Sequence, residues 1–406
     1  MGSGSGRSLR AGRRGSPSFR GTVVVTALLL LAGLLSGCLS PEGRSAIPGE
    51  TPVIRPSEAP TAFPTLPEQE TPAVTPAPAP ITLPIRGSGS SLRLTFSFNS
   101  SGEGHLVTLA LDPGALPSRG GGMVCPLSSW HPGEEAALAS YYAGIFRDPR
   151  EDALYTPLLS ELGRIRRMEG LNDDEYLELM VHFVQAIPYD ADAPVCPRTP
   201  AGVILDGRGD CDEKSLLLLG MLSREGYDAA ILIFPEERHA TAGIRITAAT
   251  QPSFRVFDSG GRKYVYIETT RPTFIGLYPD RFATADPVVI PSGNGTITYR
   301  AINDVMHIVS TQKRMEEKMT WLVTAGGDML GEITTLEGKL SSGTGYSTQE
   351  EFDADYSRYI TLVARYNQYA ADFAKIRDVY QFILDHQDDR LGVGGRIANS
   401  KVENLL

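Results

Sequence analysis

The residue of this sequence best suited to covalent chemistry is Cys211, in the stretch GRGDCDEKS that runs into the apolar segment LLLLGML. The pattern from 210 to 224 predicts a helix, which places Cys211 in its first turn. There, unpaired backbone N–H groups and the helix dipole favour an anion and can lower the pKa of a thiol. Gly207 and Gly209 permit a close approach to the sulfur. By position, Cys211 is a nucleophile, a buried structural cysteine or a disulfide partner.

A nucleophilic cysteine needs a base and a group that orients this base. Among six histidines, His239 stands just ahead of the strand-like ATAGIRI, and the other five are typical of surface or core positions. The start of this strand and the start of the preceding helix can meet at one edge of a sheet. Glu268 lies near the end of the apolar strand YVYIETT, where an unpaired charge is costly. Asp258 is the alternative acid, but DSGG is ordinary turn sequence.

These three side chains must be positioned by a helix and the strands that follow it. Leucines cover most of the circumference of the 210–224 helix, which predicts burial nearly all round. The next segments read as antiparallel strands, and NDDEYLELMVHFVQAI, closed by Pro188, predicts a preceding helix over 172–187. Residues 90–112 alternate as a β-hairpin, and 133–167 read as helices interrupted near Pro149. The strand segments are 229–234, 240–247, 253–258 and 263–270.

After residue 298 the sequence changes to two long amphipathic patterns joined by SSGTG, which predict a helical hairpin of coiled-coil type with a weak point at Gly326-Gly327. Ser347 to Glu350 has the form of a capping box at the start of the second helix. The Tyr and Met stripes on these helices indicate packing. Packing against the preceding domain and helix-mediated self-association are equally open roles.

The pieces GRGDCDEKSLLLLGMLSREGYDAAILIF, HATAGI and YVYIETT together resemble the transglutaminase-like superfamily, a branch of the papain-like cysteine enzymes. Its members carry the nucleophile in a Gly-Asp-Cys-x-Asp/Glu-Lys-Ser/Thr element that opens a helix. Their histidine and acid follow on the next strands. The resemblance covers roughly 175–280. It implies an α+β fold whose core, a Cys-bearing helix packed on an antiparallel sheet, is papain/transglutaminase-like.

The same resemblance implies residue roles: Cys211 as nucleophile, His239 as base and Glu268 as orienting acid. Glu268 departs from the Asp that many members have, and its distance of 29 residues from His239 is longer than in compact members. Papain-like enzymes often place a glutamine ahead of the nucleophile as an oxyanion donor, which implies this role for Gln185. The alternative for Gln185 is a plain helix-surface residue.

Cysteine usage and the N-terminus indicate a compartment outside the cytoplasm. Residues 1–20 are basic, an apolar run follows, and LSGC ends at Cys38, which resembles the lipobox of prokaryotic lipoproteins. The alternative is an uncleaved membrane anchor. Three cysteines remain, and one economical solution pairs Cys125 with Cys196 in a disulfide and leaves Cys211 as a thiol. All three could also be free, or Cys211 could pair instead.

The sequence divides into five predicted segments. Residues 1–38 form a lipoprotein-type signal peptide ending at the lipobox cysteine, and 39–86 form a Pro/Thr-rich linker that cannot build a core. A β-hairpin and helical lead-in covers 87–170, a transglutaminase-like domain covers 171–298, and the helical hairpin covers 299–406.

Composition limits the classes of partner and cofactor that we expect. The net charge of −10 and the lack of basic runs after residue 20 argue against nucleic acid. Acids at 210, 212 and 213 are expected at a helix start, and no His or Cys spacing supports zinc, so we expect no metal and no cofactor. We therefore expect a membrane-anchored, extracytoplasmic thiol enzyme that cleaves or transfers amide bonds of a peptide or protein substrate. The alternative is an inactive transglutaminase-like module for cell-surface binding or assembly.

Overall fold

The computed structural model describes residues 91–117, 135–192, 196–237, 239–248, 254–279, 282 and 284–406. The predicted signal peptide, the lipobox cysteine Cys38, the linker 39–86 and Cys125 lie outside these ranges. Within them, no helix has both the length and the apolar character needed to cross a membrane.

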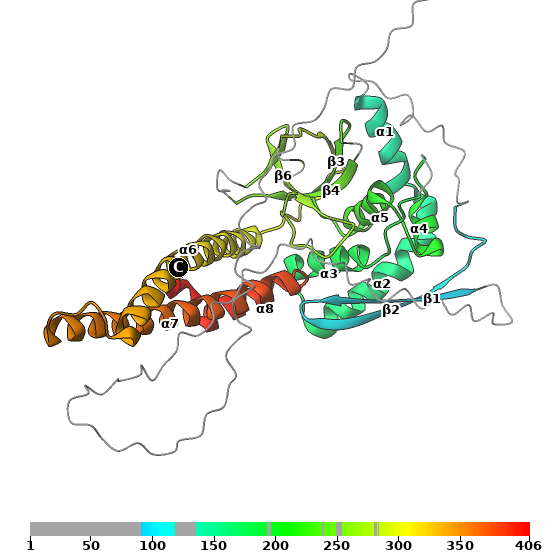
Figure 1. Ribbon diagram of the computed structural model, residues 1–406. Coiled ribbons are helices and arrows are strands. Elements are labelled where there is room, and N and C mark those ends of the chain that lie inside the picture. Colours follow the sequence, from blue (N-terminus) through cyan, green and yellow to red (C-terminus); the bar gives the residue numbers. More distant parts are fainter. Residues whose placement is uncertain are drawn as a thin grey trace, which may run out of the picture. The chain divides into compact units, whose positions relative to one another are not determined.

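The described chain is mixed α+β with antiparallel sheets and a helical C-terminal region, as the sequence predicts (Figure 1). The described residues also include the short 3-10 helices Pro149–Glu151 and Val402–Leu405. The strands are β1 (Leu92–Ser100), β2 (Glu103–Leu111), β3 (Ala229–Phe234), β4 (His239–Ile246), β5 (Phe257–Ser259), β6 (Arg262–Ile267) and β7 (Val288–Pro291). The helices are α1 (Glu135–Phe146), α2 (Asp152–Glu169), α3 (Asp173–Gln185), α4 (Pro200–Asp206), α5 (Cys211–Arg224), α6 (Ile302–Ser342), α7 (Gln349–Asp385) and α8 (Arg390–Ser400).

The larger sheet has five strands in the order β5-β6-β4-β3-β7, and every neighbouring pair is antiparallel. Alternation along the strands sends one set of side chains toward α5 and the other into a separate aromatic cluster. The bounds predicted for the strand over 253–258 are wrong, because β5 covers only Phe257–Ser259. The edge strand β7 and the short helix α4 are not predicted.

Helix α5 is the central element of the core. Every side chain from Glu213 to Leu222 is buried, as the leucine-rich sequence predicts. Figure 1 shows α5 between the five-stranded sheet and helices α2, α3 and α4. The contact with α2 depends on Gly220, because a Cβ there would lie 1.9 Å from the hydroxyl of Tyr155. That hydroxyl donates to the carbonyl of Leu217, 3.3 Å away, so α2 contacts the backbone of α5 directly.

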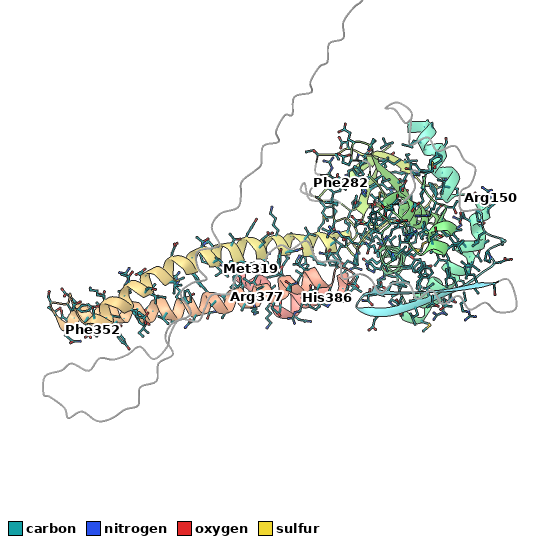
Figure 2. All side chains as sticks on the ribbon, turned by 45° about the vertical axis from the view of Figure 1, so that its right-hand side comes forward. Arg150, Phe282, Met319, Phe352, Arg377 and His386 are labelled. Atoms are coloured by element: carbon teal, nitrogen blue, oxygen red, sulfur yellow. The ribbon has the colours of Figure 1, made fainter. Side chains whose placement is uncertain are left out.

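The β1–β2 hairpin packs on α2 and α3, and one hydrophobic core continues from it through α5 to the C-terminal helices. The predicted helical hairpin is present as α6 and α7, which lie side by side (Figure 1). Helix α6 continues through Gly326-Gly327, so the weak point expected there does not interrupt it. Met319 belongs to the main core, whereas Phe352, beside the turn that joins the two helices, packs on a second cluster formed by α6 and α7 (Figure 2).

A buried ion cluster ties α8 to this core. The Arg390 guanidinium donates from Nε to Glu178 of α3, at 2.7 Å, and from another nitrogen to Asp304 of α6, at 2.6 Å. Glu178 also accepts from the Tyr299 hydroxyl at 2.7 Å. Burial raises the pKa of Glu178, and Arg390 opposes that rise. Removal of one partner from such a cluster leaves an uncompensated charge, which is strongly destabilising.

We predict that Arg390→Met lowers the free energy of unfolding by about 3–5 kcal/mol, because Glu178 loses its buried cation. Urea unfolding followed by helical circular dichroism measures this. The matched control is Arg396→Met, on the same helix, whose guanidinium pairs with Asp378 at the surface. It should cost less than about 1 kcal/mol. Equal losses in the two variants would contradict the assigned role of Arg390.

The buried side chain of His182 makes the stability of the fold depend on pH. It lies buried in α3 with Nδ1 2.8 Å from the Ser100 hydroxyl, and burial, together with His105, lowers its pKa to about 3. In the unfolded chain a histidine has a pKa of about 6.5. Between these values the unfolded chain binds the additional proton, so the stability from this residue falls as pH falls through that window.

We predict that the wild-type chain loses about 2.5 kcal/mol of stability through His182 between pH 7 and pH 4.5. His182→Gln can keep a hydrogen bond to Ser100 but does not titrate, so this part of the acid dependence should disappear. Urea midpoints at several pH values measure the slope, with the exposed His307→Gln as control. An unchanged slope in His182→Gln would refute the assignment.

Candidate functional site

The N-terminus of α5 is held by a reciprocal pair of hydrogen bonds. Asp210, the N-cap, accepts from the Glu213 N–H, and the Glu213 carboxylate accepts from the Asp210 N–H, both at 3.1 Å. Arg198 then joins the buried Glu213 to Asp190, with nitrogen–oxygen distances of 2.8 and 2.6 Å. Asp190 and Gly209 also share a backbone hydrogen bond of 3.0 Å. The residues on both sides of Cys211 are therefore fixed by polar contacts within the fold.

Cys211 is the first residue of α5, as predicted, and carries a free, half-buried thiol. The backbone N–H groups of Ala240 and Asp212 lie close enough to the sulfur to lower the pKa of the thiol. Ala240 is available because β6 ends at Ile267, opposite Ala242, so that β4 extends past it. We call His239, Ala240 and Thr241 the β4 ledge. The thiol thus lies at the β4 ledge, beside the backbone of His239.

The ionisation of Cys211 differs from the expectation. Burial raises the pKa of the thiol to about 12, against the lowering effect of the Ala240 N–H, while the nearby Asp212 and Asp210 raise it further. A helix N-terminus favours an anion, but here desolvation and two acidic neighbours outweigh it. The thiol is therefore protonated at neutral pH in this state of the protein.

His239 begins β4 and points to the aromatic side of the sheet. Its ring stacks on Phe282, with centroids 4.8 Å apart, and on Phe234, at 5.8 Å. Phe282 is labelled beside the sheet in Figure 2. The Nε2 atom lies 2.9 Å from the hydroxyl of Tyr266, and this hydroxyl donates to Glu268 Oε2 at 3.2 Å. His239 and Glu268, which the sequence predicts as site residues, are thus connected through Tyr266, which the sequence analysis did not predict.

The Glu268 carboxylate is buried and bent back onto its own chain. Its Oε1 atom accepts from the Thr270 N–H at 2.8 Å and from the Thr270 hydroxyl at 2.6 Å. Its other oxygen accepts from Tyr266. Tyr264, Tyr266 and Glu268 share one face by strand alternation, so the alternation of YVYIE was the signal that could have identified Tyr266.

Gln185 lies at the end of α3 and is buried, not on the helix surface. Its Nε2 donates to the carbonyl oxygens of Glu268, at 2.7 Å, and Thr273, at 3.1 Å. The side-chain NH₂ group of Gln185 has two N–H donors, and each of the two carbonyls requires one, so both donors are used. The contacts give Gln185 a positioning role at the end of β6. The oxyanion role that the resemblance implies stays a prediction.

Lys214 supports the same place from α5. Its buried ammonium donates to the carbonyl oxygens of Gln185, at 3.3 Å, and Ile187, at 2.5 Å. Burial lowers the pKa of Lys214 to about 7, and the proximity of Glu268 opposes this. A positive charge at the carbonyl end of α3 is electrostatically favourable. Lys214 thereby connects the start of α5 to the end of α3.

The other predicted residues remain apart from this cluster. Asp258, the alternative acid, accepts from the Gly261 N–H in a turn, as its sequence indicates. Cys196 is exposed, and its predicted bridge to Cys125 stays a prediction. Among the described residues, no group of three His, Cys, Asp or Glu side chains is arranged to hold a metal ion.

In comparisons with known proteins, no family model, no curated protein and no solved structure matches this chain.

We predict that Gln185→Leu lowers the free energy of unfolding by about 2–4 kcal/mol, because the carbonyls of Glu268 and Thr273 lose their buried donor. Urea unfolding is the measurement. The control is Gln368→Leu on α7, which removes an exposed side-chain bond to Asp372 and should change stability by less than about 0.5 kcal/mol. A loss from Gln185→Leu as small as the control's would sink the positioning role.

Proposed function

We propose that this protein is an extracytoplasmic thiol enzyme with a papain/transglutaminase-like core that acts on amide bonds of peptides or proteins through an acyl-enzyme. The supporting observation is the proximity of the Cys211 thiol to the N–H of Ala240, which follows directly on the residue whose imidazole is bonded through Tyr266 to Glu268. The order of Cys, His and acid along the chain agrees with the resemblance found in the sequence. Membrane anchoring through Cys38 is part of the same proposal.

The raised thiol pKa selects one version of the mechanism. Because Cys211 is protonated at rest, His239 would act as a general base and not as half of a preformed ion pair. The imidazole would take the thiol proton as the sulfur bonds to the amide carbonyl carbon. The resulting oxyanion would be stabilised by N–H donors at the start of α5.

Collapse of this tetrahedral intermediate breaks the carbon–nitrogen bond. The imidazolium gives its proton to the leaving nitrogen, so an amine or ammonia departs and a thioester remains on Cys211. His239 then takes a proton from water or from an acceptor amine as that nucleophile adds to the thioester. Expulsion of the thiolate, which recovers its proton from His239, yields an acid or a new amide.

A second candidate function is a binding or assembly module without catalysis. One observation favours it: burial raises the pKa of Cys211, whereas a nucleophile activated at rest has a lowered pKa. In this case the polar contacts around β6 serve only to fix the fold. The two candidates differ in whether the thiol forms an acyl-enzyme.

We predict that the full chain, incubated with glutamine-containing peptides, releases ammonia or cleaved peptide, and that Cys211→Ala lowers this rate by at least about a thousandfold. Mass spectrometry of the products and of a thioester on Cys211 measures both steps. Cys196→Ala, which changes a cysteine exposed elsewhere, is the matched control and should keep the activity. Retained activity in Cys211→Ala would refute the mechanism. If none of the peptide amides forms an acyl-enzyme on Cys211, the result would favour the binding or assembly module.

A further inference from the structure

The hydroxyl of Tyr266 lies between the two groups that a thiol enzyme would use to activate and orient its base. Tyr266 is fully buried in β6, with its oxygen 2.9 Å from His239 Nε2 and 3.2 Å from Glu268 Oε2. The other oxygen of Glu268 is occupied by the N–H and hydroxyl of Thr270. The carboxylate is thus held on one side by its own chain and on the other by Tyr266.

The direction of these bonds follows from proton counting. A phenol has one proton, and Tyr266 donates it to Glu268, which as a carboxylate only accepts. Toward His239 the same oxygen must therefore accept, so Nε2 carries the hydrogen. In a neutral imidazole the lone pair is then on Nδ1. The three side chains together select one of the two tautomers of His239.

The geometry points to Tyr266 as a positioning residue that transmits the charge of Glu268 to His239 and fixes Nδ1 as the basic atom. This rests on the proposed function, since a chosen tautomer matters only if the imidazole accepts a proton. It also accounts for the Glu that stands where many transglutaminase-like sequences have Asp. The carboxylate bonds back to Thr270, and the tyrosine hydroxyl spans the distance that remains to the imidazole.

The neighbours of the ring support an orienting role. Phe282 and Phe234 stack on the imidazole of His239 and restrict its tilt, but neither can hydrogen bond to a ring nitrogen. Stacking leaves the two tautomers nearly equal, because it does not distinguish Nδ1 from Nε2. The hydrogen bond to Tyr266 does distinguish them, because it is made by Nε2.

The test reads the tautomer directly and needs no substrate. Full-length chain labelled with ¹⁵N-histidine gives two-bond ¹H–¹⁵N correlation patterns that distinguish the two tautomers, and His239→Gln identifies the signal. At a pH where the ring is neutral, the wild type should show the form protonated at Nε2. In Tyr266→Phe the ratio of this form to the other should fall by roughly two- to tenfold, the value of one hydrogen bond. An unchanged ratio would overturn the inference.

Tyr264→Phe is the matched control. Tyr264 lies two residues earlier in β6, is equally buried, and donates its hydroxyl to Asp228 at 2.9 Å. The variant therefore removes a buried hydroxyl from the same face of the same strand without touching His239. Its tautomer ratio should equal that of the wild type. A shift equal to that of Tyr266→Phe would mean a general packing effect and would overturn the inference.

Glu268→Gln provides a second test that does not depend on Tyr266→Phe folding. The two donors of Thr270 require the amide oxygen of the new side chain, so its NH₂ group faces the Tyr266 hydroxyl. Tyr266 then accepts from that amide and donates to His239, and the tautomer should switch to the form protonated at Nδ1. Combined with Tyr266→Phe, the substitution should have no further effect. A tautomer unchanged by Glu268→Gln alone, or still switched in the double variant, would overturn transmission through Tyr266.

These outcomes are separate from those of the proposed function. If Cys211→Ala retains amide chemistry while the tautomer responds as expected, the mechanism fails and the coupling stands. If the enzyme is active through Cys211 but the tautomer ratio does not change in Tyr266→Phe, the mechanism stands and the coupling through Tyr266 fails. In an active enzyme, Tyr266→Phe should lower kcat while KM stays within about twofold, because the hydroxyl acts on the base.

Discussion

The burial of α5 on all sides is the constraint on which the rest of this structure depends. A helix with leucines around its circumference needs apolar partners in every direction, and the sheet, α2, α3 and α4 supply them. Contact through Gly220 brings α2 against the helix backbone, so this packing has little freedom to shift. Because α5 is fixed along its length, its first residue, Cys211, is fixed at the β4 ledge.

The same burial creates a conflict between placement and reactivity. Desolvation that anchors the start of α5 also disfavours a thiolate, and it outweighs the N–H groups of Ala240 and Asp212. A site built this way needs a base that acts during the reaction. The hydrogen-bonded series from His239 through Tyr266 to Glu268 is suited to this task, since a carboxylate at its end stabilises the imidazolium that forms. Orientation of the base thus matters more here than prior ionisation of the nucleophile.

Sequence reasoning succeeded where one local pattern sets one element. The leucine run predicted α5 to within a residue and AAILIF predicted β3, because burial determines both patterns. It placed Cys211, His239 and Glu268 at the correct element ends. It failed for β5, where the strand is only three residues long and its pairing with β6 sets the register. It did not single out Tyr266, since a hydroxyl's partners depend on which strands are neighbours.

The pKa of Cys211 could not be read from sequence for the same reason. A helix start predicts stabilisation of an anion, but the net effect depends on how much solvent the fold removes. In contrast, the acids next to Cys211 were visible in the sequence and were interpreted only as helix-start residues. Asp210 does serve as the N-cap, yet Asp210 and Asp212 also raise the thiol pKa. One pair of residues therefore has a structural and an electrostatic consequence.

The polar groups around the end of β6 bear on the choice between enzyme and module. Gln185, Lys214 and Glu268 are all buried, although other polar residues of the described chain are buried as well. Lys214 and Glu268 are hydrogen bonded, whereas the buried Oε1 atom of Gln185 has no hydrogen-bond partner among the described residues. Buried polar clusters often stabilise a fold no better than apolar residues of similar volume. A domain that only had to pack would gain nothing from placing three of them where Cys211 and His239 begin their elements. Their concentration around the ends of α3 and β6 is the kind of arrangement that the proposed enzyme would need.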